Sequence, residues 1–204
     1  MEACDLTDSI RNIYLSHHKE KTLSHVEAVA RTAVRLAEIH GLDPRRVRLA
    51  ALLHDISAIM TPQEMYETAK ARGMRLDPAE EKYHFLLHQR ISKIIASEQL
   101  GIEDLDILSA IECHTTLKKN AKPYDQAVFI ADKISWDQEG APPYEKELTR
   151  LAEKSLAEAC RFYINYQFGH HLLLMPHRWM TEAYEDLNSS REIDEQPDGS
   201  EQND

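Results

Sequence analysis

The sequence predicts an all-α fold, a bundle of helices, and two observations lead to this prediction. Only 6 glycines and 8 prolines occur among 204 residues, which leaves long stretches free to be helical and supplies too few turns for an all-β fold. Several of these residues stand where helices would begin or end, and no strand-like alternation or internal repeat is visible. The length suits one domain with a hydrophobic core, which we expect to span residues 1–187.

The first predicted helix covers residues 22–40. Its apolar residues recur at helical spacing, and it stops at Gly41, a residue type favoured directly after helices. Asp43 and Pro44 then form an N-cap followed by a first-turn proline. This pair predicts a second helix that ends near residue 56.

Two further starts carry the same kind of signal. The segment 61–64 reads Thr-Pro-Gln-Glu, a capping box with a proline in the first turn, and Gly73 closes the helix that it opens. Asp77 and Pro78 open the next helical region, which is expected to run to residue 100.

The second half of the chain shows the same periodicity. Helices are predicted for residues 103–115, 124–135, a long stretch from Pro142-Pro143 to about 168, and 176–187. The tail 188–204 is polar and acidic and lacks aromatic residues, so we expect it to be disordered.

Charge and cysteine content limit the class of protein. The net charge of −11 leaves no broad basic face, which argues against a nucleic-acid partner but not against a small polyphosphate. No apolar run approaches the roughly 18 residues that would span a membrane, and the N-terminus is not a secretory signal. Three cysteines, widely spaced, are typical of reduced thiols. The sequence therefore predicts a cytoplasmic protein without a membrane partner.

The dipeptide His54-Asp55 is the most informative local feature. It ends an apolar run, and His54 shares a helical face with Val47 and Ala50. Burying an imidazole beside a carboxylate is costly unless a partner satisfies both groups. A metal ion would do so.

Other histidines and one aspartate repeat this inward placement. They are His25, His88, His114 and Asp132, each on the apolar face of a predicted helix. Imidazole nitrogen and carboxylate oxygen suit iron, manganese or zinc. Six such groups are too many for one four-coordinate ion with an open position, but they suit two ions bridged by a carboxylate, the arrangement that supports phosphoester hydrolysis.

Several alternatives remain open at this point. A single histidine on an apolar face is more often a hydrogen-bonded core residue than a ligand. His84 lies one helical turn before His88 and could take its place. Cys113 could ligate a soft metal, although a buried thiol is the simpler interpretation.

The ordered series of these residues resembles the HD superfamily of metal-dependent phosphohydrolases. More narrowly, it is similar to the YqeK-type branch, the bacterial symmetrical diadenosine tetraphosphate hydrolases. The resemblance covers roughly residues 10–187 and is carried by Ala50-Ala51-Leu52-Leu53-His54-Asp55, Ala110-Ile111-Glu112-Cys113-His114-Thr115-Thr116 and Val128-Phe129-Ile130-Ala131-Asp132-Lys133-Ile134.

The resemblance implies a role for each ligand. His25, His54, Asp55 and Asp132 would hold one metal and Asp55, His88 and His114 the other, so that Asp55 bridges and is the candidate catalytic residue. It also implies a di-iron centre, with manganese as the alternative, and hydrolysis of diadenosine tetraphosphate to two ADP by a metal-bridging hydroxide.

The chain departs from the family pattern near the expected substrate. Ala58 stands where the family often has lysine, Leu117 replaces a glycine, and Ser135-Trp136 replaces a Glu-Pro pair. Lys118, Lys119 or Lys133 could offset that lysine, with ordinary surface lysines as the alternative interpretation. Thr115 could donate a hydrogen bond to a phosphate oxygen or could cap the end of its helix.

Three functions compete on the sequence alone. The first is hydrolysis of a dinucleoside polyphosphate or another nucleotide, the second is a nucleotide sensor without turnover, and the third is a histidine-rich bundle without metal. The partner expected for the first two is a small nucleotide. The sequence leaves the oligomeric state open, with a homodimer as one option.

Overall fold

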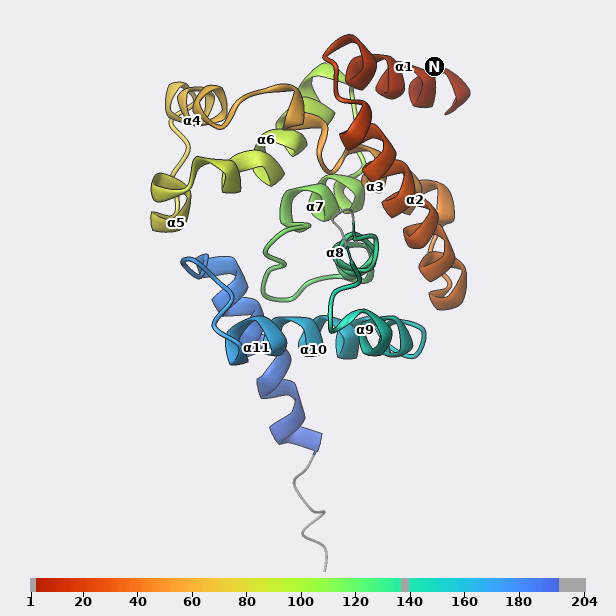
Figure 1. The fold of residues 1–204 in the computed structure, drawn as a ribbon, viewed down its shortest axis with the longest axis vertical. Helices are drawn as coiled ribbons and strands as arrows, with labels where there is room; N and C mark the ends of the chain where they lie inside the picture. Colours follow the sequence, from red (N-terminus) through yellow and green to blue (C-terminus); the bar gives the residue numbers. More distant parts are fainter. Residues whose placement is uncertain (1–2, 137–139, 195–204) are drawn as a thin grey trace, which may run out of the picture.

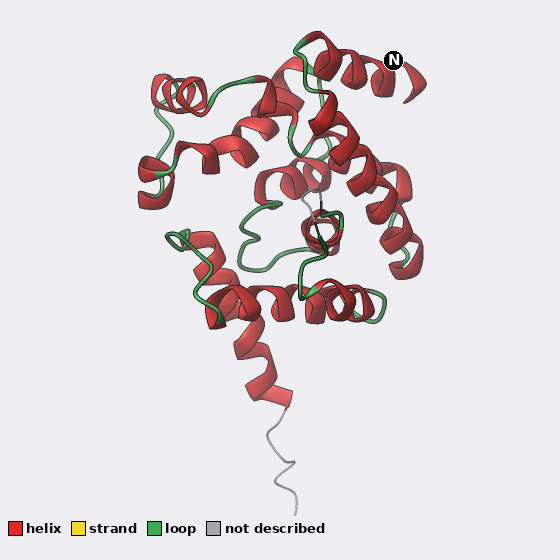
Figure 2. Cartoon of the chain, in the orientation of Figure 1, coloured by secondary structure: helices red, strands yellow, loops and turns green. Residues whose placement is uncertain are grey.

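The computed structural model describes residues 3–136 and 140–194. These residues form helices joined by loops, with no strand among them, as predicted (Figure 2). The α-helices are α1 (Ala3–Ser16), α2 (Glu20–His40), α3 (Pro44–Leu53), α4 (Pro62–Ala71), α5 (Pro78–Lys82), α6 (His88–Ile94), α7 (Leu105–Cys113), α8 (Pro123–Ile134), α9 (Glu145–Ala152), α10 (Leu156–Gly169) and α11 (Arg178–Asp194). Three short turns complete them: η1 (Ile56–Ile59), η2 (His84–Leu87) and the π-helical η3 (Ile95–Gln99).

The helices surround one hydrophobic core. Helix α2 packs on α3 and α8, α7 packs on both α6 and α8, and α10 packs on α8 and α9. Figure 1 shows α8 near the centre, α9 and α10 across one end, and α5 and α6 at the side. The largest buried side chains include Phe129, Leu36 and Ile111, one from each of α8, α2 and α7. The candidate ligands are therefore carried by the helices that build the core.

The predicted helix starts are confirmed at atomic detail. Asp43 accepts a hydrogen bond from the backbone of Arg45 at the start of α3, and Thr61 and Glu64 form a reciprocal capping box at α4. Gly41 ends α2 with φ +68°, a left-handed conformation that glycine adopts without a steric penalty.

Two predicted helices are interrupted. The region 77–100 divides into α5, η2, α6 and η3, because Tyr83 leaves the helical conformation with φ −126° and ψ 84°. The stretch from Pro142 to residue 168 divides into α9 and α10 at Ser155, which has an extended backbone and accepts a hydrogen bond from the backbone of Glu158. The second helix, predicted to reach residue 56, ends at Leu53 and is followed by η1.

Helix α1 was not predicted from the sequence. This helix places Ile10 and Tyr14 in the core, both with no exposed surface. Leu6, Ile10, Ile13 and Tyr14 do follow helical spacing, but no proline or glycine marks the ends of the segment.

The predicted tail begins too early. Helix α11 continues to Asp194, so residues 188–194 are helical rather than disordered. Asn188 explains part of this extension, because its side chain pairs with Asn165 of α10 and also donates to the carbonyl of Tyr184. Residues 195–204 lie outside the described residues. Within the described part, each helix is too short or too polar to cross a lipid bilayer.

Candidate metal centre

The structure brings all six predicted ligands together. They come from five helices that are far apart in the sequence. His25 lies on α2, His54 ends α3 with Asp55 directly after it, His88 begins α6, His114 ends α7, and Asp132 lies on α8. Their donor atoms form two adjoining groups.

The first group surrounds one carboxylate oxygen of Asp132. His25 Nε2 lies 3.1 Å from Asp132 Oδ1, and His54 Nε2 lies 3.7 Å from the same oxygen. His54 Nε2 is also 3.5 Å from Asp55 Oδ2. Within the set formed by His25, His54 and Asp55, the donor atoms all lie within 4.8 Å of one another.

The second group uses the other oxygen of Asp55. Asp55 Oδ1 lies 3.4 Å from His114 Nε2 and 3.6 Å from His88 Nε2. The two imidazole nitrogens are themselves 2.9 Å apart. Asp55 is therefore shared, with one oxygen facing each group.

Three of the imidazoles are oriented by the helical turn that carries them. In each case Nδ1 lies within hydrogen-bond distance of the backbone carbonyl three residues earlier: His54 and Ala51 at 2.7 Å, His88 and Phe85 at 2.7 Å, His114 and Ile111 at 2.9 Å. A carbonyl only accepts, so Nδ1 carries the proton in each ring. The Nε2 lone pair is then directed into the centre, as a metal ligand requires.

These donors fit a cation. With the proton on Nδ1, His88 and His114 point two lone pairs at each other across 2.9 Å, which is unfavourable unless a positive charge lies near both. His54 Nε2 is buried and finds no hydrogen-bond partner among the described residues. Nitrogen and oxygen donors of this kind suit a transition metal.

The charges around the site favour ionised carboxylates at Asp55 and Asp132 and a neutral imidazole at His114. Burial raises the pKa of Asp55, but the imidazoles of His54, His114 and His88 outweigh it and hold that pKa well below its usual value. Burial likewise opposes ionisation of Asp132, but Lys133, His25 and His54 have a larger, opposite effect and hold its pKa well below the usual value. Burial lowers the pKa of His114 to about 4, so this imidazole is neutral at pH 7.

The predicted phosphate contacts lie in different surroundings. Thr115 Oγ1 is 2.9 Å from His88 Nε2, and Lys133 Nζ donates to Asp132 Oδ2 at 2.6 Å, so both residues border the centre. Lys119 is exposed. The ammonium of Lys118 instead lies 2.5 Å from Ser109 Oγ and 3.7 Å from a carboxylate oxygen of buried Asp125.

The structure distinguishes the alternatives that the sequence left open. His84 stacks on Tyr66, with ring centroids 4.0 Å apart and an interplanar angle of 9°, while His88 faces Asp55 and His114. Cys113 is a buried free thiol, and burial raises its pKa well above the usual value, which disfavours the thiolate that a metal would need.

A residue that was not predicted to belong to the site holds the loop after α7. Gln89 is fully buried, and its Oε1 accepts from the backbone of Thr115 at 3.2 Å and of Thr116 at 3.3 Å. Its Nε2 donates to Thr116 Oγ1 at 3.1 Å. Gln89 thus fixes Thr115 beside the centre. In the sequence, the position of Gln89 directly after the candidate ligand His88 was the only indication of this role.

Two buried serines position His88 in a similar way. Ser57 Oγ donates to the carbonyl of His88 at 2.9 Å, and Ser92 Oγ donates to Ser57 Oγ at 3.0 Å. They connect η1, directly after Asp55, to α6. Nothing in the spacing of these serines marks them before the fold is known.

Comparisons with known proteins show the family of this chain. Residues 22–137 match the family model described as HD domain. The bis(5'-nucleosyl)-tetraphosphatase, symmetrical, of Halalkalibacterium halodurans is 31% identical over 66% of this chain and 71% of that protein. The relative of the same name in Bacillus subtilis is 30% identical over the same shares of the two chains.

A solved structure extends the similarity to nearly the whole fold. It is described as a predicted HD superfamily hydrolase involved in NAD metabolism from Clostridium acetobutylicum. The TM-score is 0.81 at 29% identity, covering 90% of this chain and 97% of that one. Together with the all-α fold and the His-Asp cluster, these similarities show that the chain belongs to the HD domain family of metal-dependent phosphohydrolases.

Proposed function

We propose that this protein hydrolyses a dinucleoside polyphosphate, cutting diadenosine tetraphosphate to two ADP, at a centre that holds two metal ions. The position of Asp55 carries the proposal. One carboxylate oxygen faces His54 and the other faces His88 and His114, and this geometry supports a bridging role for the side chain. Two-metal centres of this kind are suited to phosphoryl transfer.

Each ion would have its own set of ligands. His25, His54, Asp55 and Asp132 would hold one ion, and Asp55, His88 and His114 would hold the other. The donors are nitrogen and oxygen only, which favours iron or manganese over a thiolate-selective metal. Iron is our first choice and manganese the alternative.

The side chains around the centre would divide the remaining work. Bound ions would supply positive charge to phosphate oxygens and would lower the pKa of water to about 7. Lys133, on the outer oxygen of Asp132, and the exposed Lys119 would add positive charge for the polyphosphate. Thr115 would donate its hydroxyl to a phosphate oxygen when substrate replaces its contact with His88. Lys118 is better placed to stabilise the loop through Asp125.

The choice of substrate rests on the relatives. Those from Halalkalibacterium halodurans and Bacillus subtilis carry the name of a symmetrical bis(5'-nucleosyl)-tetraphosphatase. Ala58 and Leu117 depart from the family's substrate loops, so a related nucleotide is the alternative substrate.

The test uses the full chain purified without a histidine tag and loaded with iron or manganese. We expect about two metal equivalents per chain and release of ADP from diadenosine tetraphosphate. Asp55→Ala should lose turnover and metal uptake while its circular dichroism stays helical. Asp8→Ala, which alters an exposed aspartate on α1, is the matched control and should behave like the wild type. Turnover at the wild-type rate by Asp55→Ala would refute the bridging role. Metal binding without release of product from any nucleotide would make the protein a sensor.

A further inference from the structure

Two aromatic rings are exposed beside the metal centre. The Phe, Tyr and Trp residues all lie in the part of the chain that the structure describes, and of these side chains only Phe85, at 47%, and Trp136, at 41%, are exposed. Phe85 comes three residues before the candidate ligand His88, and Trp136 comes four residues after the candidate ligand Asp132. Each ring is therefore carried about one helical turn from a ligand, with one ring beside each group of donors.

The geometry of η2 directs Phe85 to the same side as His88. This segment is a 3₁₀ helix, in which side chains three positions apart lie directly above one another. His84 and Leu87 form one such pair, since the first stacks on Tyr66 of α4 and the second is fully buried. Phe85 and His88 form the next pair. Because His88 points into the centre, the exposed ring of Phe85 borders the second group of donors.

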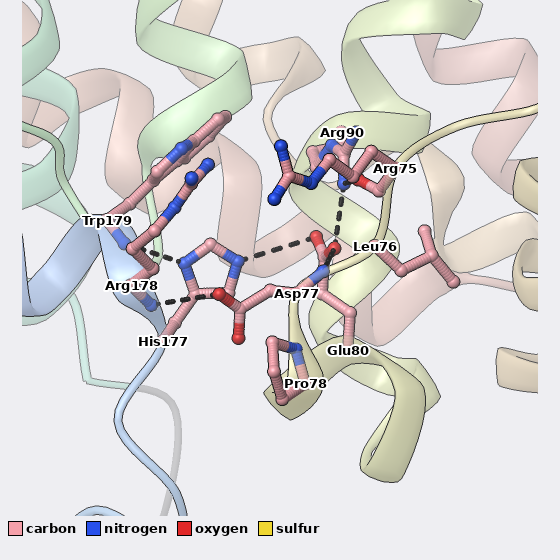
Figure 3. Close-up of a pocket in the computed structure, with 9 residues that line it drawn as sticks. All are labelled: Arg75, Leu76, Asp77, Pro78, Glu80, Arg90, His177, Arg178 and Trp179. Atoms are coloured by element: carbon pink, nitrogen blue, oxygen red, sulfur yellow. Dashed lines mark hydrogen bonds and ion pairs between the residues drawn. The ribbon is translucent and has the colours of Figure 1, made fainter.

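The helices on either side of η2 are held together by the buried side chain of Glu80. Arg90 of α6 donates to one carboxylate oxygen of Glu80 on α5 at 2.7 Å (Figure 3). His177, directly before α11, lies 3.6 Å from the other oxygen. These contacts fix both ends of η2, so the ring of Phe85 is presented from a preorganised position.

Trp136 lines a pocket that adjoins the first group of donors. The pocket has a volume of about 430 Å³, within the range of about 300–1,000 Å³ that is usual for ligand pockets, and Ala28 and Thr32 of α2 also line it. His25, Ala28 and Thr32 follow one side of α2, and Thr32 lies about 10 Å along the helix from His25. Thr32 Oγ1 also contacts Ser135 Oγ at 2.9 Å. The pocket thus begins about one turn beyond the ligands, where the nucleoside of a substrate would lie if its phosphates were held at the centre.

We propose that Phe85 and Trp136 each stack on one nucleobase of a dinucleoside polyphosphate whose phosphates lie at the metal centre between them. Every base has a π face, so two rings favour substrates with two bases without selecting a particular base. The inference rests on the proposed function and extends it, because it names the residues that recognise the two ends of the substrate.

The test measures the binding of three probes to the full-length, metal-loaded chain by calorimetry. The first is diadenosine tetraphosphate with a methylene group in place of the central bridging oxygen, which prevents symmetrical cleavage. The second is β,γ-methylene ATP, which has one base, and the third is methylenediphosphonate, which has none. The wild type should bind them in this order, with an affinity about tenfold lower for each base removed, because stacking of a base on an aromatic ring contributes about that factor.

Substitutions identify the two rings. Phe85→Ala and Trp136→Ala should each weaken the two-base probe about tenfold and leave methylenediphosphonate within about twofold. Phe85→Tyr and Trp136→Phe keep a ring and should stay within about threefold of the wild type, whereas Phe85→Leu, which keeps apolar bulk without a π face, should behave like Phe85→Ala. Leu105→Ala is the control, because it alters an exposed leucine at the opposite end of α7 from His114, and it should bind all three probes like the wild type.

Three results would overturn the inference. They are equal affinity of the wild type for the two-base probe and methylenediphosphonate, unchanged affinity for the two-base probe in either alanine variant, and a parallel loss of methylenediphosphonate binding, which would give the rings a structural role only. The two-base probe resists cleavage at its centre, so a lack of turnover of diadenosine tetraphosphate would refute the proposed function and leave these measurements intact. The two proposals can therefore fail separately.

Discussion

His88 and His84 lie one helical turn apart in the sequence but have different surroundings. His88 Nε2 faces Asp55 and His114, while the ring of His84 stacks on Tyr66. We therefore expect His88→Ala to lower turnover by about 100-fold or more and to reduce metal content, because loss of a ligand exceeds the 10–100-fold cost typical of groups that only support one. His84→Ala should stay within about threefold. Turnover and metal content measured on both variants decide the matter, and the reverse order would assign the ligand to His84.

Leu117 combines a strained backbone with a buried side chain. Its φ is +55°, in the region that favours glycine, yet its side chain has no exposed surface. Replacing leucine by alanine in a core costs about 2–5 kcal/mol. Glycine at this position would lose the same packing but relieve about 1 kcal/mol of backbone strain. Leu117→Gly should therefore be more stable than Leu117→Ala in urea unfolding, and the opposite order would contradict this account of the loop.

At the scale of elements, Glu80 joins α5 to α6. It closes the capping box at the start of α5 and accepts a hydrogen bond from Arg90 of α6. Burial alone would raise the pKa of Glu80. The opposing effects of His177, the backbone of Asp77 and Arg90 are larger, so the pKa is lowered from its usual value of 4.5. The folded-state pKa thus lies below that of the unfolded chain, so ionised Glu80 stabilises the fold above pH 4.5, and this contribution is lost as pH falls through the folded-state value.

Glu80→Gln tests this dependence. The stability difference between wild type and variant, from urea unfolding, should be largest near pH 7 and shrink below pH 4.5. Glu185→Gln, an exposed position on α11, is the matched control and should show little difference at any pH. A difference for Glu80→Gln that is constant with pH would exclude a role for the ionised carboxylate.

Helix ends marked by particular residue types were the predictable part of the fold. Asp43 and Thr61 cap helices because their side chains accept hydrogen bonds from backbone N–H groups of the first turn. This effect is local, so the sequence of a few neighbouring residues is enough to predict it. The break at Tyr83 and the extension of α11 through Asn188 depend on packing between segments. Such effects leave no periodic signal in one stretch of sequence.

For the whole molecule, the metal centre acts as a junction of five helices between residues 25 and 132. A ligand that binds only the folded state stabilises it by about 2.7 kcal/mol at 100 times its Kd. Removing metal with a chelator should therefore lower the Tm of the wild type by about 5–10 °C. Differential scanning calorimetry of wild type and Asp55→Ala, each with and without chelator, checks this, and Asp55→Ala should show no shift. An unchanged Tm in the wild type would mean that the six side chains do not bind metal.

The convergence of the six side chains was predictable because inward-facing histidines and aspartates need a common partner. Lys118 and Gln89 show where that reasoning ends. Lys118 follows the motif around His114 and suggested a phosphate contact, but its ammonium lies near Asp125. Gln89 reaches the loop at Thr115 and Thr116 across 26 or more positions of sequence. Both contacts are set by the relative placement of α6, α7 and α8, which no single segment encodes.

The hydrogen bonds from His54, His88 and His114 to carbonyls of their own preceding turns have a consequence for how such a protein can change over time. Because each ring is aimed by the turn that carries it, chelation does not rely on the loops that meet substrate. Substitutions in those loops can therefore leave the orientation of the three rings unchanged. Residues that contact the substrate could therefore change during evolution while the metal ligands stay the same.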